Sequence, residues 1–142
     1  MSGFRKYADL DIGSQFPETP ARYLVTAEVV DAYRAITAQS LIASDSDAQR
    51  PVDVAEAPPT LAAVYIRPAQ NALRGPPGGV HAKQQFAFHA PVRIGDVLDT
   101  TLVIQEKYER KGRNYLVSET RTVNQRGVVV TTSRITQIWG QE

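Results

Sequence analysis

The chain carries two histidines, His81 and His89, and both lie in the stretch GGVHAKQQFAFHAPVRIGDVL (residues 78–98). Imidazole exchanges a proton near neutral pH, so a histidine partnered by a carboxylate can act as a general acid or base. Lys83 and Asp96 lie in the same stretch and could supply charge. The same residues can equally mark the entry of a β-strand, its end and the turn that follows.

The flanking residues favour the structural role. His81 follows a Gly-rich loop, whose backbone its ring nitrogens could bond while fixing the entry of a strand. His89 precedes an Ala-Pro pair, which places it at a strand end, on the surface or in a subunit interface. Asp96 follows a turn glycine, where an aspartate commonly accepts backbone N–H bonds. The alternative for His81 is a general base or a hydrogen-bond donor to a substrate carbonyl.

Further carboxylates lie in the segment ASDSDAQRPVDVAEA (Ala43–Ala57). Its Ser, Asp and Pro content predicts a loop. Asp45 and Asp47 are candidate catalytic groups there, and the alternative is that both are solvated loop carboxylates.

Composition limits the class of protein. The 142 residues fit one domain, and a net charge of +1 gives no reason to expect a nucleic-acid partner. The chain has no cysteine, which excludes disulfides, thiolate metal sites and a cysteine nucleophile. We expect no metal and no cofactor. The N-terminal residues lack the apolar run of a signal peptide, and no run approaches the ~20 residues of a membrane span, so we expect a cytoplasmic protein.

The first half of the chain predicts two helices. Arg22–Thr26 indicates a short strand that runs into a helix, with Thr26 as its N-cap and Val29, Tyr33 and Ile36 on one face. Thr60–Ile66 is almost entirely apolar and follows two prolines, which predicts a helix enclosed on every side. Pro68 should kink or stop this second helix.

The second half predicts strands rich in Val, Ile, Thr and aromatic residues, joined as a meander by glycine-containing turns. The expected strands are Gln84–His89, Val97–Glu109, Tyr115–Val123 and Val128–Trp139. Apolar residues occur in both parities, which predicts a sheet covered on both faces, in part by another subunit. The fold class is therefore α+β, with an antiparallel sheet wrapped around one central apolar helix.

Four motifs resemble the MaoC-like hydratases and dehydratases, which have the hot-dog fold and act on acyl thioesters. VTAEVVDAYRAI (25–36) resembles their first helix, and APPTLA (57–62) the entry to their central helix. Residues 78–98 resemble a His-x-x-Gln strand followed by Pro-x-x-x-Gly-Asp, and NQRGVVVTT (124–132) the turn before the last strand. The resemblance covers about residues 20–139. It implies one hot-dog domain over residues 1–142, with residues 1–19 as an N-terminal extension.

The resemblance is strongest to the N-terminal half of two-domain members, which shapes the acyl pocket while the other half carries the catalytic pair. That pair is an Asp and a His five positions later. The matching segment here, residues 36–54, contains aspartates that no His follows, and neither His81 nor His89 has an Asp five positions before it. We therefore expect an accessory or degenerate subunit. The alternatives are an active hydratase or hot-dog thioesterase that uses His81 or a loop aspartate, and a non-catalytic acyl-CoA binding protein.

The resemblance also implies ligands and partners. The ligand would be an acyl-CoA or acyl-carrier thioester, and the assembly a homodimer or a heterodimer with a catalytic MaoC-like chain. Thr60, Tyr65 and Gly79 are the candidates for substrate contacts. Tyr65 and Trp139 could instead be core or interface aromatics.

Overall fold

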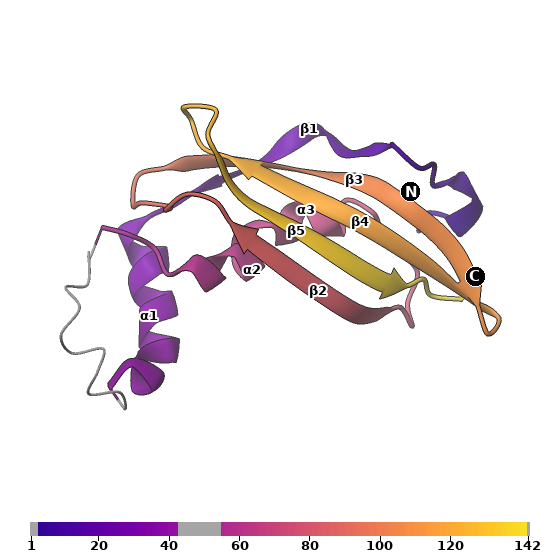
Figure 1. The fold of residues 1–142 in the computed structure, drawn as a ribbon, viewed down its shortest axis with the longest axis horizontal. Helices are drawn as coiled ribbons and strands as arrows, with labels where there is room; N and C mark the ends of the chain where they lie inside the picture. Colours follow the sequence, from indigo (N-terminus) through magenta and orange to yellow (C-terminus); the bar gives the residue numbers. More distant parts are fainter. Residues whose placement is uncertain (1–2, 43–54, 142) are drawn as a thin grey trace.

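The computed structural model describes residues 3–42 and 55–141, with the side chains of residues 38–42 left out. The described strands form one antiparallel sheet in the order β1-β3-β4-β5-β2, and the helices lie against one of its faces (Figure 1). The strands are β1 (Gln15–Leu24), β2 (Val80–Phe88), β3 (Val97–Arg110), β4 (Arg113–Val123) and β5 (Val129–Ile138). The helical segments are η1 (Tyr7–Asp9), α1 (Ala27–Ile42), η3 (Pro59–Leu61), α2 (Ala62–Tyr65) and α3 (Arg67–Asn71). The predicted α+β hot-dog architecture is confirmed.

The strand order departs from the predicted meander at β2. Strands β3, β4 and β5 are joined by tight turns as expected, but β2 pairs with β5 and not with β3. Residues 89–96 carry the chain across the end of the sheet from β2 to β3 (Figure 1). Apolar periodicity predicts that a strand exists, but it contains no information about which strand lies next to it.

The sheet also begins earlier than expected. Strand β1 pairs with β3 from Gln15 to Leu24, so it starts inside the segment expected as an N-terminal extension. In the preceding turn η1, the Tyr7 hydroxyl donates to the backbone oxygen of Tyr115 at 2.7 Å. This contact fastens the residues before β1 to β4.

Helix α1 follows β1 as predicted. The Thr26 hydroxyl accepts a hydrogen bond from the Val29 N–H at 3.2 Å, which is the expected N-cap. Val30 is fully buried, whereas Ile36 is 82% exposed. Of the predicted apolar face, Val29 and Tyr33 pack against the core, whereas Ile36 does not, because the helix runs away from the sheet toward its C-terminal end (Figure 1).

The central helix consists of η3, α2 and α3 in succession. Leu61, Tyr65 and Ile66 are buried between α1 and the sheet. Val64 is 39% exposed, so the helix is not enclosed on every side in this chain. Pro68 lies in the first turn of α3, which matches the predicted kink.

The inner face of the sheet, toward the helices, is unusually rich in hydroxyl groups. The buried hydroxyl-bearing residues on this face are Thr100, Ser118, Thr120, Thr122, Thr131 and Ser133. Several of them pair, for example Thr100 with Thr122 at 2.8 Å. Toward the far end of the sheet the inner face becomes apolar, and Trp139, only 2% exposed, packs with Leu10 and Leu73. The core role of Trp139 is therefore confirmed.

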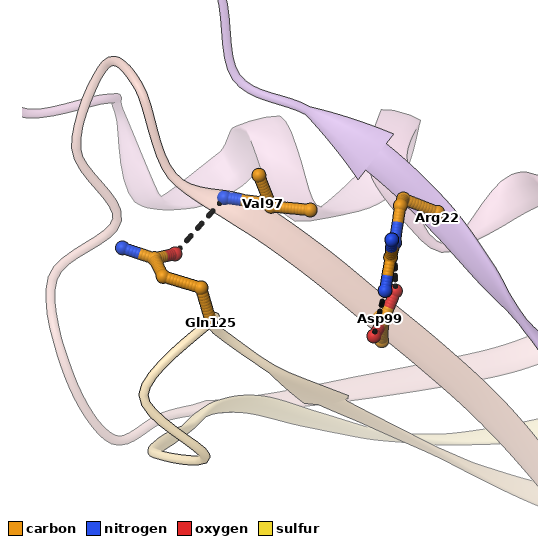
Figure 2. Close-up of polar contacts among 4 residues, drawn as sticks. All are labelled: Arg22, Val97, Asp99 and Gln125. Carbon is orange, nitrogen blue, oxygen red and sulfur yellow. Dashed lines mark hydrogen bonds and ion pairs between the residues drawn. The ribbon is translucent and has the colours of Figure 1, made fainter.

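The described helices lie on the inner side of the sheet (Figure 1), and the expected cover of the outer face, in part by another subunit, stays a prediction. An exposed ion pair joins Arg22 of β1 to Asp99 of β3 at 3.0 Å (Figure 2). Another joins Glu106 to Arg134 at 3.4 Å.

Candidate functional site

A cavity of about 300 Å³ opens beside the entry of the central helix. It lies where three segments meet: the end of β2, the link from β2 to β3, and the residues before η3. Its walls are Glu56, Ala57, Pro58, Pro59, Tyr65, Phe88, His89, Ala90, Pro91, Val92 and Thr131. Most of these side chains are apolar, as in pockets that hold the chain of a small ligand.

Backbone pairing holds two of the cavity walls together. The Ala57 N–H donates to the Val92 oxygen at 2.7 Å, and the Ile94 N–H donates to the Ala55 oxygen at 2.7 Å. An isolated bridge between Glu56 and Arg93 belongs to the same contact. The link from β2 to β3 is therefore fixed against the entry of the central helix.

Asp96 anchors the other end of this link. Its carboxylate accepts the Arg93 N–H at 2.9 Å and the Gln125 side-chain amide at 3.0 Å, and Asp96 is only 6% exposed. The Gln125 oxygen in turn accepts the Val97 N–H at 3.0 Å (Figure 2). The predicted turn role of Asp96 is confirmed, and the turn between β4 and β5 supports it.

A pair of hydroxyl groups lines the cavity. The Tyr65 hydroxyl and the Thr131 hydroxyl lie 2.5 Å apart, on the central helix and on β5, and Tyr65 is 2% exposed. Burial raises the pKa of Tyr65 above its usual value, so the phenol is neutral at physiological pH. This pair is the buried polar part of a mainly apolar wall, which also includes Glu56 and His89.

The two histidines lie far apart. His81 is the second residue of β2 and His89 follows its last residue, so eight positions of extended chain place them about 26 Å apart. They therefore cannot act on one substrate within this chain. His89 is exposed, lines the cavity, and its Nε2 lies 2.9 Å from the Thr132 hydroxyl. His81 is exposed near the Gly-rich loop, and within the described residues its ring makes no hydrogen bond to that loop.

The three residues predicted to contact the substrate do not lie together in the structure. Tyr65 lines the cavity, but Thr60 and Gly79 do not. The Thr60 hydroxyl accepts a hydrogen bond from Tyr33 at 2.6 Å on the exposed side of the helices. Gly79 lies at the opposite end of β2, where a side chain would come within 3.2 Å of the Ile138 oxygen. Asp45 and Asp47 lie outside the described residues.

Sequence reasoning missed most of the cavity wall. The sequence indicates only a strand end around Phe88 and Pro91, and only a turn motif around Thr131. Each residue reaches the cavity because of the crossing from β2 to β3 or the pairing of β2 with β5. Within the described residues, no cluster of three His, Asp or Glu side chains could hold a metal ion. None of the described helices has the length and apolarity needed to cross a membrane.

Comparison with known proteins agrees with this architecture. Residues 11–133 match the sequence model of the family described as "FAS1-like, dehydratase domain region". A "UPF0336 protein" of Saccharopolyspora erythraea is 28% identical over 136 residues, covering 89% of this chain and 87% of that protein.

Solved structures share the fold. The MaoC-like dehydratase from Rhodospirillum rubrum superposes with a TM-score of 0.73 at 23% identity, covering 96% of this chain and 97% of that one. A chain of the C-terminally truncated HadBC (3R-hydroxyacyl-ACP dehydratase) complex from Mycobacterium tuberculosis gives a TM-score of 0.70 at 24% identity, covering 89% and 96%. The chain thus belongs to the FAS1-like dehydratase region family and has the hot-dog fold of the MaoC-like dehydratases.

Proposed function

We propose that this chain is an accessory, substrate-holding subunit of a MaoC-like dehydratase or hydratase. The cavity would accept the acyl chain of a thioester carried by coenzyme A or by an acyl carrier protein. The proposal is supported by a mainly apolar cavity of about 300 Å³ in a chain whose sequence has no Asp followed by a His five positions later. On this proposal the cavity holds the acyl chain, and a partner chain provides the groups that move the protons.

The chemistry explains why a partner is needed. Hydration of a 2-enoyl thioester requires a base that takes a proton from water and an acid that protonates the α-carbon. In the sequence, positions five residues after Asp45, Asp47 and Asp53 are Arg50, Val52 and Pro58. A catalytic MaoC-like chain would supply the missing pair.

Strand β2 is the surface that fits such a partner. Its nine residues are almost all exposed, and its outer edge pairs with no other described strand. Free strand edges invite pairing with another chain unless they are blocked. At the opposite edge of the sheet, β1 carries Pro17 and Pro20, which interrupt backbone pairing. The asymmetry supports an edge-to-edge dimer through β2, and the HadBC structure is likewise a complex of chains.

The test is hydration of 2-enoyl-coenzyme A substrates of several chain lengths by the purified chain, alone and with a catalytic MaoC-like subunit from the same organism. We expect the chain alone to be slower than the complete enzyme by about 10²–10⁴-fold for each proton transfer that it lacks. Addition of the partner should restore the rate. A full rate from the chain alone would refute the accessory role.

A pair of variants tests the cavity in the same assay. Pro91→Trp would fill the cavity from an exposed wall position, whereas Ile36→Trp adds the same ring at a site that is 82% exposed and outside the cavity. The first should raise KM for long acyl chains more than for short ones. The second should leave KM unchanged for both, and equal effects would argue against the cavity as the acyl site.

One observation favours a second function, catalysis by this chain itself. Glu56 and His89 both line the cavity, so this chain has one acidic residue and one histidine at the same site. In such a site Glu56 would take a proton from water, the oxygen would add to the β-carbon, and His89 would give a proton to the α-carbon. Loss of a measurable rate in both Glu56→Gln and His89→Asn, but not in His81→Asn, would support this function over the accessory one.

A further inference from the structure

The Tyr65–Thr131 pair leaves one hydroxyl proton without an acceptor. Two hydroxyl groups carry two protons, and a hydrogen bond between them uses one. If Tyr65 donates to Thr131, the Thr131 proton remains, and in the reverse arrangement the Tyr65 proton remains. Neither side chain has another hydrogen-bond partner among the described residues.

This spare donor lies at the cavity. Both residues are walls of the cavity, while Tyr65 is 2% and Thr131 1% exposed. A buried donor without an acceptor lowers stability, so an acceptor entering the cavity would be held there. The buried pair of Thr100 and Thr122 has the same chemistry but does not line this cavity.

The apolar wall residues next to the pair indicate the rest of the ligand that would carry the acceptor oxygen. Pro58, Pro59, Ala90, Pro91 and Val92 offer carbon surface, and the ring of Phe88 adjoins them. Thr131 has nearly the volume of valine, so packing alone could have been satisfied without a hydroxyl at this place. A ligand that matches both features is a hydrocarbon chain with one oxygen along it.

We propose that the Tyr65–Thr131 pair is a specificity site that selects acyl chains carrying an acceptor oxygen, such as a hydroxyl or ketone, over plain chains of equal length. The proposal rests on the proposed function, because it assumes that the cavity holds the acyl chain of a thioester. It adds which acyl chains are preferred and which side chains select them.

The experiment measures Kd by calorimetry for octanoyl-coenzyme A and for its 3-hydroxy, 5-oxo and 7-oxo derivatives. In the wild-type protein, at least one oxygenated ligand should bind about 3- to 10-fold more tightly than octanoyl-coenzyme A, the range expected for one hydrogen bond. The position of the oxygen in that ligand would locate the pair along the chain. Equal affinities for all four ligands would overturn the proposal without the use of any variant.

Variants identify the residues responsible. Each single change, Tyr65→Phe or Thr131→Val, leaves one hydroxyl that can still donate, so the double variant is the decisive one. In the double variant the Kd values for the oxygenated ligand and for octanoyl-coenzyme A should become equal within about twofold, because no hydroxyl of the pair remains to bond the oxygen. The matched control is Tyr33→Phe, which breaks a Tyr–Thr hydroxyl bond of 2.6 Å outside the cavity and should keep the full preference.

The outcomes separate the two proposals. Binding of octanoyl-coenzyme A with no preference for an oxygenated chain would reject the specificity site and keep the acyl cavity. Failure of all four ligands to bind, with and without a catalytic partner, would reject the acyl cavity itself. Persistence of the preference in a folded double variant, or its loss in Tyr33→Phe, would also reject the specificity site.

Discussion

Replacement of Asp96 by alanine tests whether this carboxylate anchors the cavity wall. Asp96 is 6% exposed and accepts hydrogen bonds from the Arg93 N–H and from the Gln125 amide. The first bond joins a charged acceptor to a backbone donor, which contributes about 1.5–3 kcal/mol. Gln125 is exposed and can turn to water, so its bond adds only about 0.5–1 kcal/mol. We therefore expect Asp96→Ala to lower the free energy of unfolding by about 2–4 kcal/mol.

The matched control is Asp99→Ala, three residues along the chain. It removes the same carboxylate, but Asp99 forms a surface ion pair whose Arg22 partner is 72% exposed. Exposed pairs of this kind contribute about 0–1 kcal/mol. Urea unfolding at one fixed protein concentration, followed by the fluorescence of the single Trp139, measures both variants. An Asp96→Ala loss no larger than that of Asp99→Ala, with the same m-value, would refute the anchoring role.

Three further predictions follow from other contacts. Gly140→Ala should destabilise the fold by about 2 kcal/mol or more, because a Cβ there would lie 2.4 Å from the Pro77 oxygen; Gly3→Ala, with open space around it, is the control in the same urea assay. The Arg22 guanidinium lowers the pKa of Asp99, so the ion pair stabilises the fold above the ordinary aspartate pKa and its contribution is lost as pH falls through the lowered value. Asp99→Asn should accordingly reduce the fall in the free energy of unfolding below about pH 4. An Arg22→Gln variant whose free energy of unfolding falls with pH just as the wild type's does would contradict this. Sedimentation should give a dimer or larger species at micromolar concentration, with amide exchange in β2 slowing on association, and a monomer with fast exchange in β2 would exclude pairing at that edge.

The fold could be predicted from the sequence because its elements have local signatures. The N-cap at Thr26, the turn at Asp96 and the kink at Pro68 are each read from a few neighbouring residues, and each is confirmed. The place of β2 in the sheet could not be read in this way. Strand pairing is decided by long-range packing, and a link of eight residues is long enough to reach either edge of a small sheet.

The candidate site could likewise be predicted only where its features depend on residues close together in the sequence. The sequence shows that no Asp is followed by a His five positions later, because that spacing is local and can be read directly. It could not join Tyr65 to Thr131, which are 66 residues apart and meet only after β5 packs against the central helix. The sequence did predict that His81 and His89 mark the two ends of a strand, and β2 confirms this, because eight extended positions span about 26 Å.

The free edge and the cavity meet at the same residues, and this links the two parts of the proposed function. Phe88 is 48% exposed at the end of β2, its ring stacks on Phe86 at 5.8 Å, and Phe88 and His89 both line the cavity. A second chain that paired along β2 would cover these exposed rings and become a further wall of the cavity. Acyl affinity and dimer formation should then rise together, since each ligand bound by the dimer also stabilises the dimer. A catalytic partner at this edge would bring its acid and base to the mouth of the cavity, where this chain would hold the acyl group.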